Sequence, residues 1–530
     1  MTQHACIISS LHLEFPTRII FTDLNFSLFK GKVSALIGRN GQGKSLLLNL
    51  LHSHLDSRSS LDFDCHGQIL WQMKHAYLDQ FQRCTGDCIA DALDVLPLHL
   101  AFERIQQNIA TDSDYLLVEN QWQQPQLWQQ LLSSADLPVD LNFKIESLSE
   151  GQKTKLSLVK LLLKTDHYLL LDEPANHLDT KSRAWLLKAL QHHPAGALII
   201  SHDKTTLGQA EHIYHLSENG LTHTDGGFEI YSSQREKQIS ALSASIEQEK
   251  RDLKKLKSRQ QDSVMKAKKR EKSGQKLRSS ASQSKMILDS KKESAGQSLA
   301  GLLNQQKRQL QQGEQSLKDK QSVLEIIQPQ DFEFPHIDVS IREILRIRQL
   351  ILPYGSRSPI NFALTAREKS RLVGNNGTGK STLLKMINQQ DQSRHPDIYL
   401  NARCFYLDQN FNCLDPDKNA IENLIQFNPH LTATTWRQLL GNLRLRGEKG
   451  LLKIHQLSGG ERLKVLLTGI AQLNPLPELL LLDEPDNHLD LESKDLLAKA
   501  IASWQGAMIL VSHDDAFVDT CGIHTQLKLS

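Results

Sequence analysis

The sequence has 530 residues, of which 39% are hydrophobic and 23% charged, with a formal net charge of only +2. This length is enough for two or three domains with separate cores, and the composition excludes a chain that is disordered throughout. No apolar run reaches the ~18 residues needed to span a bilayer, and the N-terminus lacks the pattern of a signal peptide, so we expect a cytoplasmic protein.

The first predicted elements form a phosphate-binding unit. Residues 32–37 are predicted to be a buried strand, and residues 45–51 open a helix. Between them lies a run that fits the phosphate-loop pattern, Gly38-Arg39-Asn40-Gly41-Gln42-Gly43-Lys44-Ser45. Its glycines would let backbone N–H groups surround phosphates, Lys44 would meet the β- and γ-phosphates, and Ser45 would place a hydroxyl on Mg²⁺. The stretch predicts an ATP site.

Four further motifs follow along the first half of the chain. They are Tyr77-Leu78-Asp79-Gln80, Leu148-Ser149-Glu150-Gly151-Gln152, Leu170-Leu171-Asp172-Glu173-Pro174-Ala175-Asn176-His177-Leu178-Asp179 and Ser201-His202-Asp203. The apolar runs before Asp172 and Ser201 predict core strands of a mainly parallel sheet.

All five motifs recur in the same order in the second half. The copies are Gly374-Asn375-Asn376-Gly377-Thr378-Gly379-Lys380-Ser381, Tyr406-Leu407-Asp408-Gln409, Leu457-Ser458-Gly459-Gly460-Glu461, Leu481-Leu482-Asp483-Glu484-Pro485-Asp486-Asn487-His488-Leu489-Asp490 and Ser512-His513-Asp514. This duplication predicts two α/β domains with the same chemistry.

The repeated polar residues suggest how ATP is cleaved. Asp172 and Asp483, at strand ends, are predicted to hold Mg²⁺ with Ser45 and Ser381, largely through water. The remaining candidates are Glu173 and Glu484 as general bases, Gln80 and Gln409 near Mg²⁺ and the attacking water, and His202 and His513 near the γ-phosphate. Taken alone, a solvated strand end or a structural histidine would explain these residues, but the paired phosphate loops favour catalysis.

The segment between the two halves is basic and has helical periodicity. Residues 250–292 contain sixteen Lys and Arg against four Asp and Glu, and no aromatic residue. Apolar residues recur at heptad-like spacing on both sides of it: Ile239, Leu242, Ile246, Leu253 and Leu256, then Leu303, Leu310, Leu317 and Leu324. This pattern predicts an antiparallel helical hairpin with residues 266–292 at its tip. The basic residues 250–292 predict contact with RNA or DNA through recognition of the nucleic-acid backbone or shape.

These motifs resemble the Walker A, Q-loop, signature, Walker B, D-loop and H-loop of ABC ATPases. The Asn-His-Leu-Asp run after each Walker B and the charged linker resemble the ABC-F family in particular. The resemblance implies an α/β protein with two P-loop ABC nucleotide-binding domains, residues 1–234 and 331–530, joined by a coiled-coil hairpin linker, residues 235–330.

The same resemblance implies a function and its partners. ABC-F cassettes close head to tail around ATP, so the signature residues of one half would face the ATP of the other; these residues are Ser149, Gly151, Ser458 and Gly460. The expected protein is a monomeric ATPase that acts on the ribosome through its linker, which in this family reaches toward tRNA. Phe15 and Tyr354 are candidates for stacking on adenine, although either could be a core aromatic.

Several features leave alternatives open. Glu150 replaces a signature glycine and Asp486 replaces a small or hydroxyl residue, although we expect both sites to be competent. The segment from Gln80 to Leu148 is about twenty residues longer than its counterpart, which fits an extra arm or a subdomain with longer helices. A transporter energy subunit and a DNA-binding cassette ATPase are the rival functions. The scattered cysteines, including the pair Cys84 and Cys88, are expected to be reduced thiols, and we assign no metal to them.

Overall fold

The computed structural model describes residues 3–16, 18–53, 64–79, 84–175, 178–217, 220–279, 285–337, 340–375, 377–389, 396–487 and 489–529. The chain divides into two compact units. One unit contains Met1–Ile230 together with Gln330–Ser530, and the other is Tyr231–Pro329. The first unit holds both repeats, which we call cassette 1 and cassette 2, and the second is the arm.

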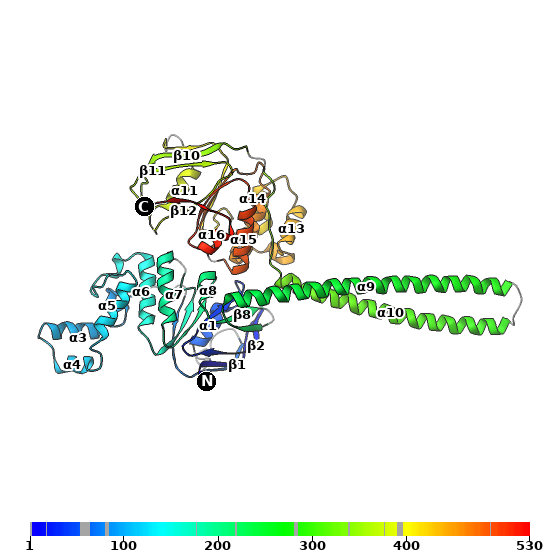
Figure 1. The fold of residues 1–530 in the computed structure, drawn as a ribbon, viewed down its shortest axis with the longest axis horizontal. Coiled ribbons are helices and arrows are strands. Elements are labelled where there is room, and N and C mark those ends of the chain that lie inside the picture. The colour runs from blue at the N-terminus through cyan, green and yellow to red at the C-terminus, as the bar shows by residue number, and fades with distance from the viewer. Residues whose placement is uncertain are drawn as a thin grey trace. The chain divides into compact units, whose positions relative to one another are not determined.

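Cassette 1, coloured blue through cyan to green in Figure 1, is built on a six-stranded sheet in which only the last strand is antiparallel to its neighbour. In spatial order the strands are β5 (Lys74–Leu78), β6 (His167–Asp172), β7 (Ala197–Ile200), β3 (Val33–Ile37), β8 (His212–Ser217) and β9 (Gly220–Asp225). The near-continuous buried runs of the central strands β6, β7 and β3 are typical of parallel strands that are covered on both faces.

A smaller antiparallel sheet and one helix complete the core of cassette 1. The sheet consists of β1 (His4–Phe15), β2 (Arg18–Phe29) and β4 (Asp64–Trp71). Four leucines of α1 (Lys44–His52) pack in one cluster with residues of β1, β2 and β6; they are Leu47, Leu48, Leu50 and Leu51. Helices α7 (Thr180–Gln191) and α8 (Lys204–Gly208) follow β6 and β7.

A helical subdomain separates β5 from β6. Its helices are α2 (Ile89–Ala92), α3 (Leu96–Gln106), α4 (Asp112–Val118), α5 (Gln124–Ser134) and α6 (Glu150–Leu162), packed around the buried Trp128. Arg104 of α3 pairs with Asp114 of α4, whose pKa this guanidinium holds well below its usual range. The shorter counterpart in cassette 2 has α12 (Ala420–Phe427), α13 (Ala433–Asn442) and α14 (Gly459–Ala471). The extra length of cassette 1 therefore forms additional helices.

Cassette 2 repeats the layered arrangement. Its parallel sheet has the order β14 (Cys404–Leu407), β15 (Leu479–Asp483), β16 (Ala507–Val511), β12 (Lys369–Val373) and β17 (Thr525–Lys528), and its antiparallel sheet the order β11 (Ile360–Thr365), β10 (Glu343–Leu350) and β13 (Ile398–Leu400). The remaining helices are α11 (Lys380–Asn388), α15 (Leu491–Ser503) and α16 (Asp515–Thr520). The predicted tandem α/β fold is confirmed.

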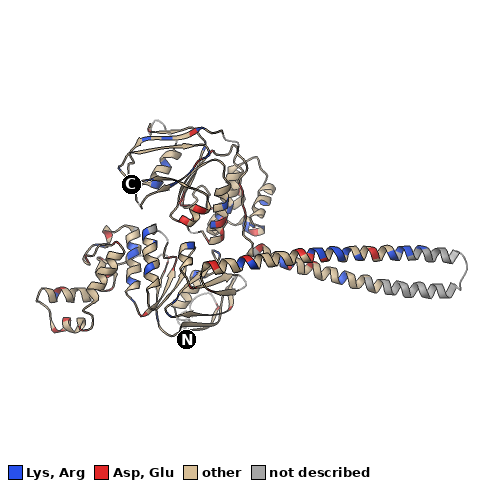
Figure 2. Cartoon of the chain, viewed as in Figure 1, with Lys and Arg blue, Asp and Glu red and all other residues tan. Residues whose placement is uncertain are grey.

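The arm consists of two long antiparallel helices, α9 (Phe228–Ser279) and α10 (Lys285–Ile327). Ile246, Leu253 and Leu310 are buried between them, as the heptad spacing predicts. Ion pairs join the helices at Lys257 to Glu314, 2.8 Å, and at Lys320 to Glu249, 2.9 Å. Figure 2 shows Lys and Arg distributed along α9. Within the predicted tip, residues 280–284 lie outside the described residues. The same holds for most side chains between residues 267 and 299.

Within the described residues, no helix is both long and apolar enough to cross a membrane.

Candidate functional site

Each phosphate loop joins a buried strand to a helix, as the motif requires. Gly43 and Gly379 precede α1 and α11 with φ of 90° and 93°, a left-handed conformation that favours glycine. A Cβ on Gly43 would also lie 2.5 Å from Ile20 Cγ2. Lys44 and Lys380 are buried, and each Nζ donates to a carbonyl of its own loop, Gly38 O or Gly374 O, at 2.8 Å. Each ammonium group therefore lies inside its loop, where a phosphate could take over these contacts.

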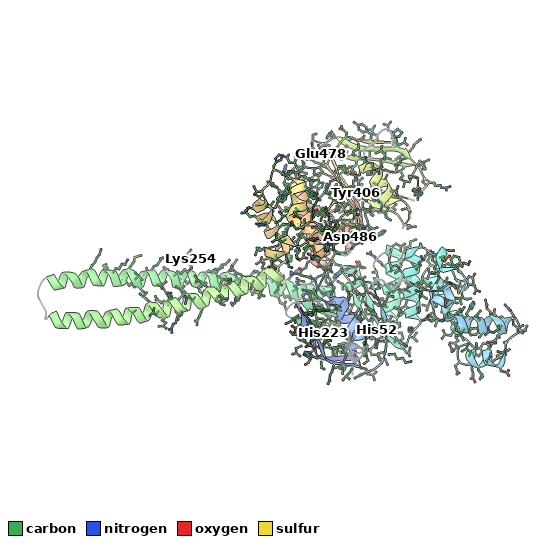
Figure 3. All side chains as sticks on the ribbon, turned by 180° about the vertical axis from the view of Figure 1, so that it is seen from behind. His52, His223, Lys254, Tyr406, Glu478 and Asp486 are labelled. Atoms are coloured by element: carbon green, nitrogen blue, oxygen red, sulfur yellow. The ribbon has the colours of Figure 1, made fainter. Side chains whose placement is uncertain are left out.

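The Walker B aspartates suit a hard divalent cation. Both carboxylate oxygens of Asp172 are buried without a well-aligned hydrogen bond among the described residues. Burial raises the pKa of Asp172 to about 6, and the neighbouring Ser45 hydroxyl offsets part of this rise. In cassette 2 the Tyr406 hydroxyl (Figure 3) donates to Asp483 Oδ2 at 3.1 Å, and burial again raises the aspartate pKa. Under-coordinated carboxylates beside a loop hydroxyl are donors that Mg²⁺ prefers, so the residues fit this ion.

The next residue in each cassette is a glutamate with an unusual backbone conformation. Glu173 and Glu484 both have φ of 49°, which is uncommon for a residue other than glycine. His202 Nε2 lies 3.7 Å from Glu173 Oε1, and His513 Nε2 lies 3.4 Å from Glu484 Oε1. The nearby His513 ring lowers the pKa of Glu484. The fold thus brings together the glutamate and the histidine that lie 29 residues apart in the sequence of each cassette.

The signature serines begin helices. Ser149 is the N-cap of α6 and Ser458 the N-cap of α14, and each accepts from a backbone N–H three residues on at 3.3 Å. Free N–H groups at a helix start attract anions such as phosphate. Gly460 packs tightly, because an added Cβ would lie 2.1 Å from Ser493 Oγ.

Contacts between the cassettes place Asp490 and Glu492, which follow the Walker B motif of cassette 2, against the phosphate loop of cassette 1. The backbone N–H of Asn40 donates to Asp490 Oδ2 at 3.0 Å, and Arg39 Nε lies 2.6 Å from Glu492 Oε2. Lys464 of α14 is half-buried near Arg39, and its partial burial lowers its pKa to about 8. The order of the motifs in the sequence gives no sign of these roles for Asp490, Glu492 and Lys464, because it does not show which residues meet across the two halves.

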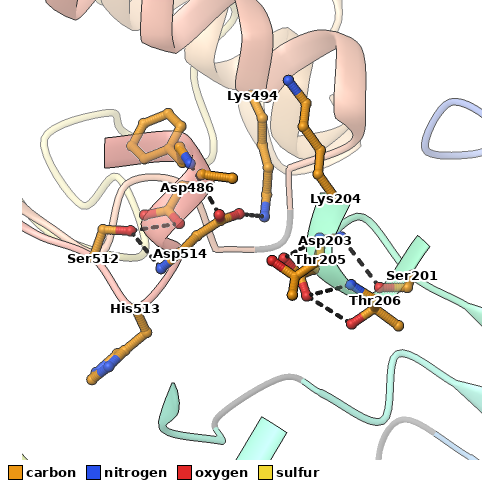
Figure 4. Close-up of polar contacts among 12 residues, drawn as sticks. Ser201, Asp203, Lys204, Thr205, Thr206, Asp486, Lys494, Ser512, His513 and Asp514 are labelled. Atoms are coloured by element: carbon orange, nitrogen blue, oxygen red, sulfur yellow. Dashed lines mark hydrogen bonds and ion pairs between the residues drawn. The ribbon is translucent and has the colours of Figure 1, made fainter. Parts of the chain in front are cut away.

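The second departure from the family pattern, Asp486, is buried and hydrogen-bonded. Ser512 Oγ donates to Asp486 Oδ2 at 2.9 Å, and Lys494 Nζ lies 3.1 Å from Asp514 Oδ2 (Figure 4). The equivalent position in cassette 1 is Ala175. The substitution therefore adds a buried carboxylate to cassette 2 while Asp483, Glu484 and His513 keep their places.

The remaining residues that the sequence singled out are Gln80, Asn376, Glu150, Gln409 and the two adenine candidates. Gln80 and Asn376 lie outside the described residues, as does the side chain of Glu150. Gln409 follows β14 and is half-buried. Of the adenine candidates, Phe15 is partly buried against the core, and Tyr354 is 78% exposed.

Comparisons with known proteins agree with this architecture. The family described as "ABC transporter" matches residues 21–176 and 358–487, more than half of the chain. The chain is 27% identical to the Energy-dependent translational throttle protein EttA of Haemophilus influenzae, over 96% of this chain and 89% of that protein. It is also 27% identical to ABC transporter F family member 2 of Arabidopsis thaliana, over 94% of this chain and 73% of that protein.

One solved structure, titled RNase-L Inhibitor, has a similar fold. Its TM-score is 0.51 at 15% identity, covering 98% of this chain and 86% of that one. Together, the duplicated motifs, their geometry and these matches identify the family: the chain belongs to the ABC transporter family, as a tandem-cassette ATPase of the ABC-F type.

Proposed function

We propose that this ATPase binds one ATP at each phosphate loop and, in its ATP-bound closed form, acts on the ribosome in translation. The hydrogen bond from Asn40 to Asp490 supports this proposal, because it brings a residue of cassette 2 to the phosphate loop of cassette 1. Ser458 would face the ATP held by Lys44, and Ser149 the ATP held by Lys380. Gly151 and Gly460, next to these serines, would allow close approach of the backbone. We further propose domain limits of 1–234, 235–330 and 331–530 for the two cassettes and the arm.

The phosphate loops would hold the triphosphate. Their backbone N–H groups and the starts of α1 and α11 would contact the phosphates, and Lys44 and Lys380 would exchange their loop carbonyls for phosphate oxygens. Ser45 with Asp172, and Ser381 with Asp483, would hold Mg²⁺. The ion, when bound, neutralises charge that develops on the phosphate oxygens.

Hydrolysis would use the paired glutamates. Glu173 or Glu484 would accept a proton from a water molecule while the water oxygen bonds to the γ-phosphorus. The bond between the γ-phosphorus and the β–γ bridging oxygen would break at the same time, which gives ADP and phosphate. His202 and His513, within 4 Å of these carboxylates, would orient them and contact the γ-phosphate. Gln80 and Gln409 would position the attacking water. Because each ATP would bridge the cassettes, its cleavage would remove the contacts that hold them closed.

The arm would contact RNA. Residues 250–292 are strongly basic and contain no aromatic residue, which favours phosphate contacts over base stacking. The relative from Haemophilus influenzae is named as a translational throttle protein, which supports the ribosome as the partner. A cytoplasmic location and a monomer with intramolecular pairing follow from this proposal.

Sucrose-gradient sedimentation of the Glu173→Gln, Glu484→Gln double variant in cell lysate tests the proposal. Loss of the general bases should slow ATP turnover by about 100-fold or more while ATP binding persists, so the variant should accumulate on ribosomes only with ATP. A matched control, Glu119→Gln with Glu448→Gln, changes one exposed glutamate in each cassette and should sediment as the parent does. Sedimentation independent of ATP would overturn the proposal, and salt-sensitive binding to DNA junctions in preference to ribosomes would favour a DNA partner.

A further inference from the structure

Two histidines and an aspartate lie on one face of the β8–β9 hairpin in cassette 1. The antiparallel register pairs His212 with Asp225 and Tyr214 with His223, so the three polar side chains point to the same side. His212 Nδ1 lies 3.1 Å from Asp225 Oδ1, His223 Nε2 lies 3.3 Å from the same oxygen, and the two nitrogens are 3.3 Å apart. Three donor atoms thus form a nearly equilateral triangle.

This triangle has the size of one face of a tetrahedral metal site. Zinc binds imidazole nitrogen and carboxylate oxygen at about 2.0–2.1 Å, which separates neighbouring ligands of a tetrahedron by about 3.3 Å. We propose that His212, His223 and Asp225 bind a divalent transition-metal ion of the Zn²⁺ class. Asp225 is 81% exposed, so solvent can reach the site and water can complete the coordination.

The packing around the histidines orders them for this role. The His212 ring lies against Phe29, with centroids 4.7 Å apart, and the His223 ring stacks on Tyr214 at 4.7 Å and 12°. Tyr214 is itself fixed, because its hydroxyl donates to Ser27 O at 2.5 Å. Ligands held by such contacts lose little freedom when the ion enters.

The proposed site is separate from the ATP site and is not repeated in cassette 2. His212 pairs with Ser34 at the beginning of β3, whereas the phosphate loop follows Ile37 at the end of that strand. In cassette 2 the equivalent pairing is Ser370 with Thr525, and β17 is the last strand among the described residues. A metal at this place would therefore stabilise the β8–β9 hairpin, which ends three residues before α9 begins.

A hydrogen-bonded trio without an ion is the competing explanation, because both imidazoles could donate to Asp225 Oδ1. Zinc titration of the full-length chain distinguishes the two. The protein should be free of a polyhistidine tag, stripped with chelator and titrated with Zn²⁺ by calorimetry. We expect about one equivalent to bind at micromolar concentrations, and Co²⁺ to give visible absorption bands of a low-coordinate nitrogen and oxygen site.

Variants then assign the ligands. His223→Gln and Asp225→Asn should each weaken Zn²⁺ binding by about tenfold or more, whereas His215→Gln, on the neighbouring strand β8, should bind as the parent does. ATP turnover within about twofold of the parent would show that each variant is folded. Parent protein that binds no Zn²⁺, or variants that keep the parent's affinity, would overturn the proposal.

Discussion

Gly460, the second signature glycine of cassette 2, is held by a close contact with α15. An added Cβ would lie 2.1 Å from Ser493 Oγ, and the Ser493 N–H donates to Asp490 Oδ1 at 2.8 Å. Gly460→Ala should therefore displace Ser493 and destabilise the fold by about 1–3 kcal/mol, a typical cost of overpacking. Thermal unfolding of the purified variant would show this as a lower Tm.

Gly441→Ala is the matched control for that substitution. It adds the same methyl group within α13, where the nearest neighbouring atom would be 3.8 Å away. Its Tm should equal or exceed that of the parent, because alanine favours a helix over glycine. Equal effects of the two substitutions would contradict the close-contact explanation.

Asp486 should make stability depend on pH. Burial raises the pKa of its carboxyl above the ordinary value, with a smaller contribution from Asp514 and an opposing one from Lys494. The folded protein therefore prefers the protonated acid, and the cost of ionising it appears as pH rises from about 4 through the folded-state pKa. Asp486→Asn should raise Tm at pH 7 to 8, and the gain should vanish near pH 4.

The Tm of both proteins across this pH range measures the effect. Asp519→Asn is the control, because it removes a charge at an exposed position on α16 without changing a buried group. The difference in Tm between this variant and the parent should not depend on pH. A loss of stability in Asp486→Asn at pH 8 would mean that the ionised carboxylate contributes favourably through Lys494.

At the residue scale, the sequence was informative where chemistry is local. Lys44 and Ser45 lie in one run of eight residues, and their counterparts Lys380 and Ser381 lie in another. The spacing alone therefore predicted that each pair belongs to one phosphate loop. The pairing of Glu173 with His202 was predictable, because the same spacing of 29 residues separates Glu484 from His513 in cassette 2. The trio His212, His223 and Asp225 was missed, since its geometry depends on the register of one hairpin, which a short polar strand does not specify.

At the scale of elements, the arm depends on a narrow apolar seam. Leu253 of α9 is buried and faces Gly313 of α10, where an added Cβ would lie 2.7 Å from Leu253 Cδ2. Leu253→Ala should lower the local opening free energy of the arm by about 2 kcal/mol or more, because it leaves a cavity at this crossing. Hydrogen exchange of backbone amides in residues 231–329 should accelerate, while exchange in the cassettes should not change.

The neighbouring Lys254, which is exposed and labelled in Figure 3, provides the control. Lys254→Ala keeps helix propensity and leaves the seam intact, so its exchange should match the parent. Identical exchange in both variants would show that the seam does not hold the helices together.

Heptad spacing predicted this hairpin because the leucine stripes repeat over several turns, which gives a strong periodic signal. The additional helices α3 and α4 were harder to foresee. Their sequence signals only extra length, and the pairing that joins them, Arg104 with Asp114, connects residues on two short helices separated by a turn.

At the scale of the molecule, the arrangement of the cassettes rests on contacts that no single repeat encodes. Arg39 and Glu492 form a half-buried ion pair with side chains 34% and 28% exposed. Reversing one charge places like charges together: Arg39→Glu meets Glu492, and Glu492→Arg meets Arg39 near Lys464. Each single variant should lower kcat/KM for ATP by about tenfold, a change of about 1.4 kcal/mol.

The double variant Arg39→Glu, Glu492→Arg decides whether the pair forms in the working enzyme. Restoring opposite charges should return kcat/KM to within about threefold of the parent, and high salt should reduce the defects of the single variants because it screens partly exposed charges. If the two losses instead add in the double variant, the charges act independently. The cassettes would then meet through other residues during ATP turnover.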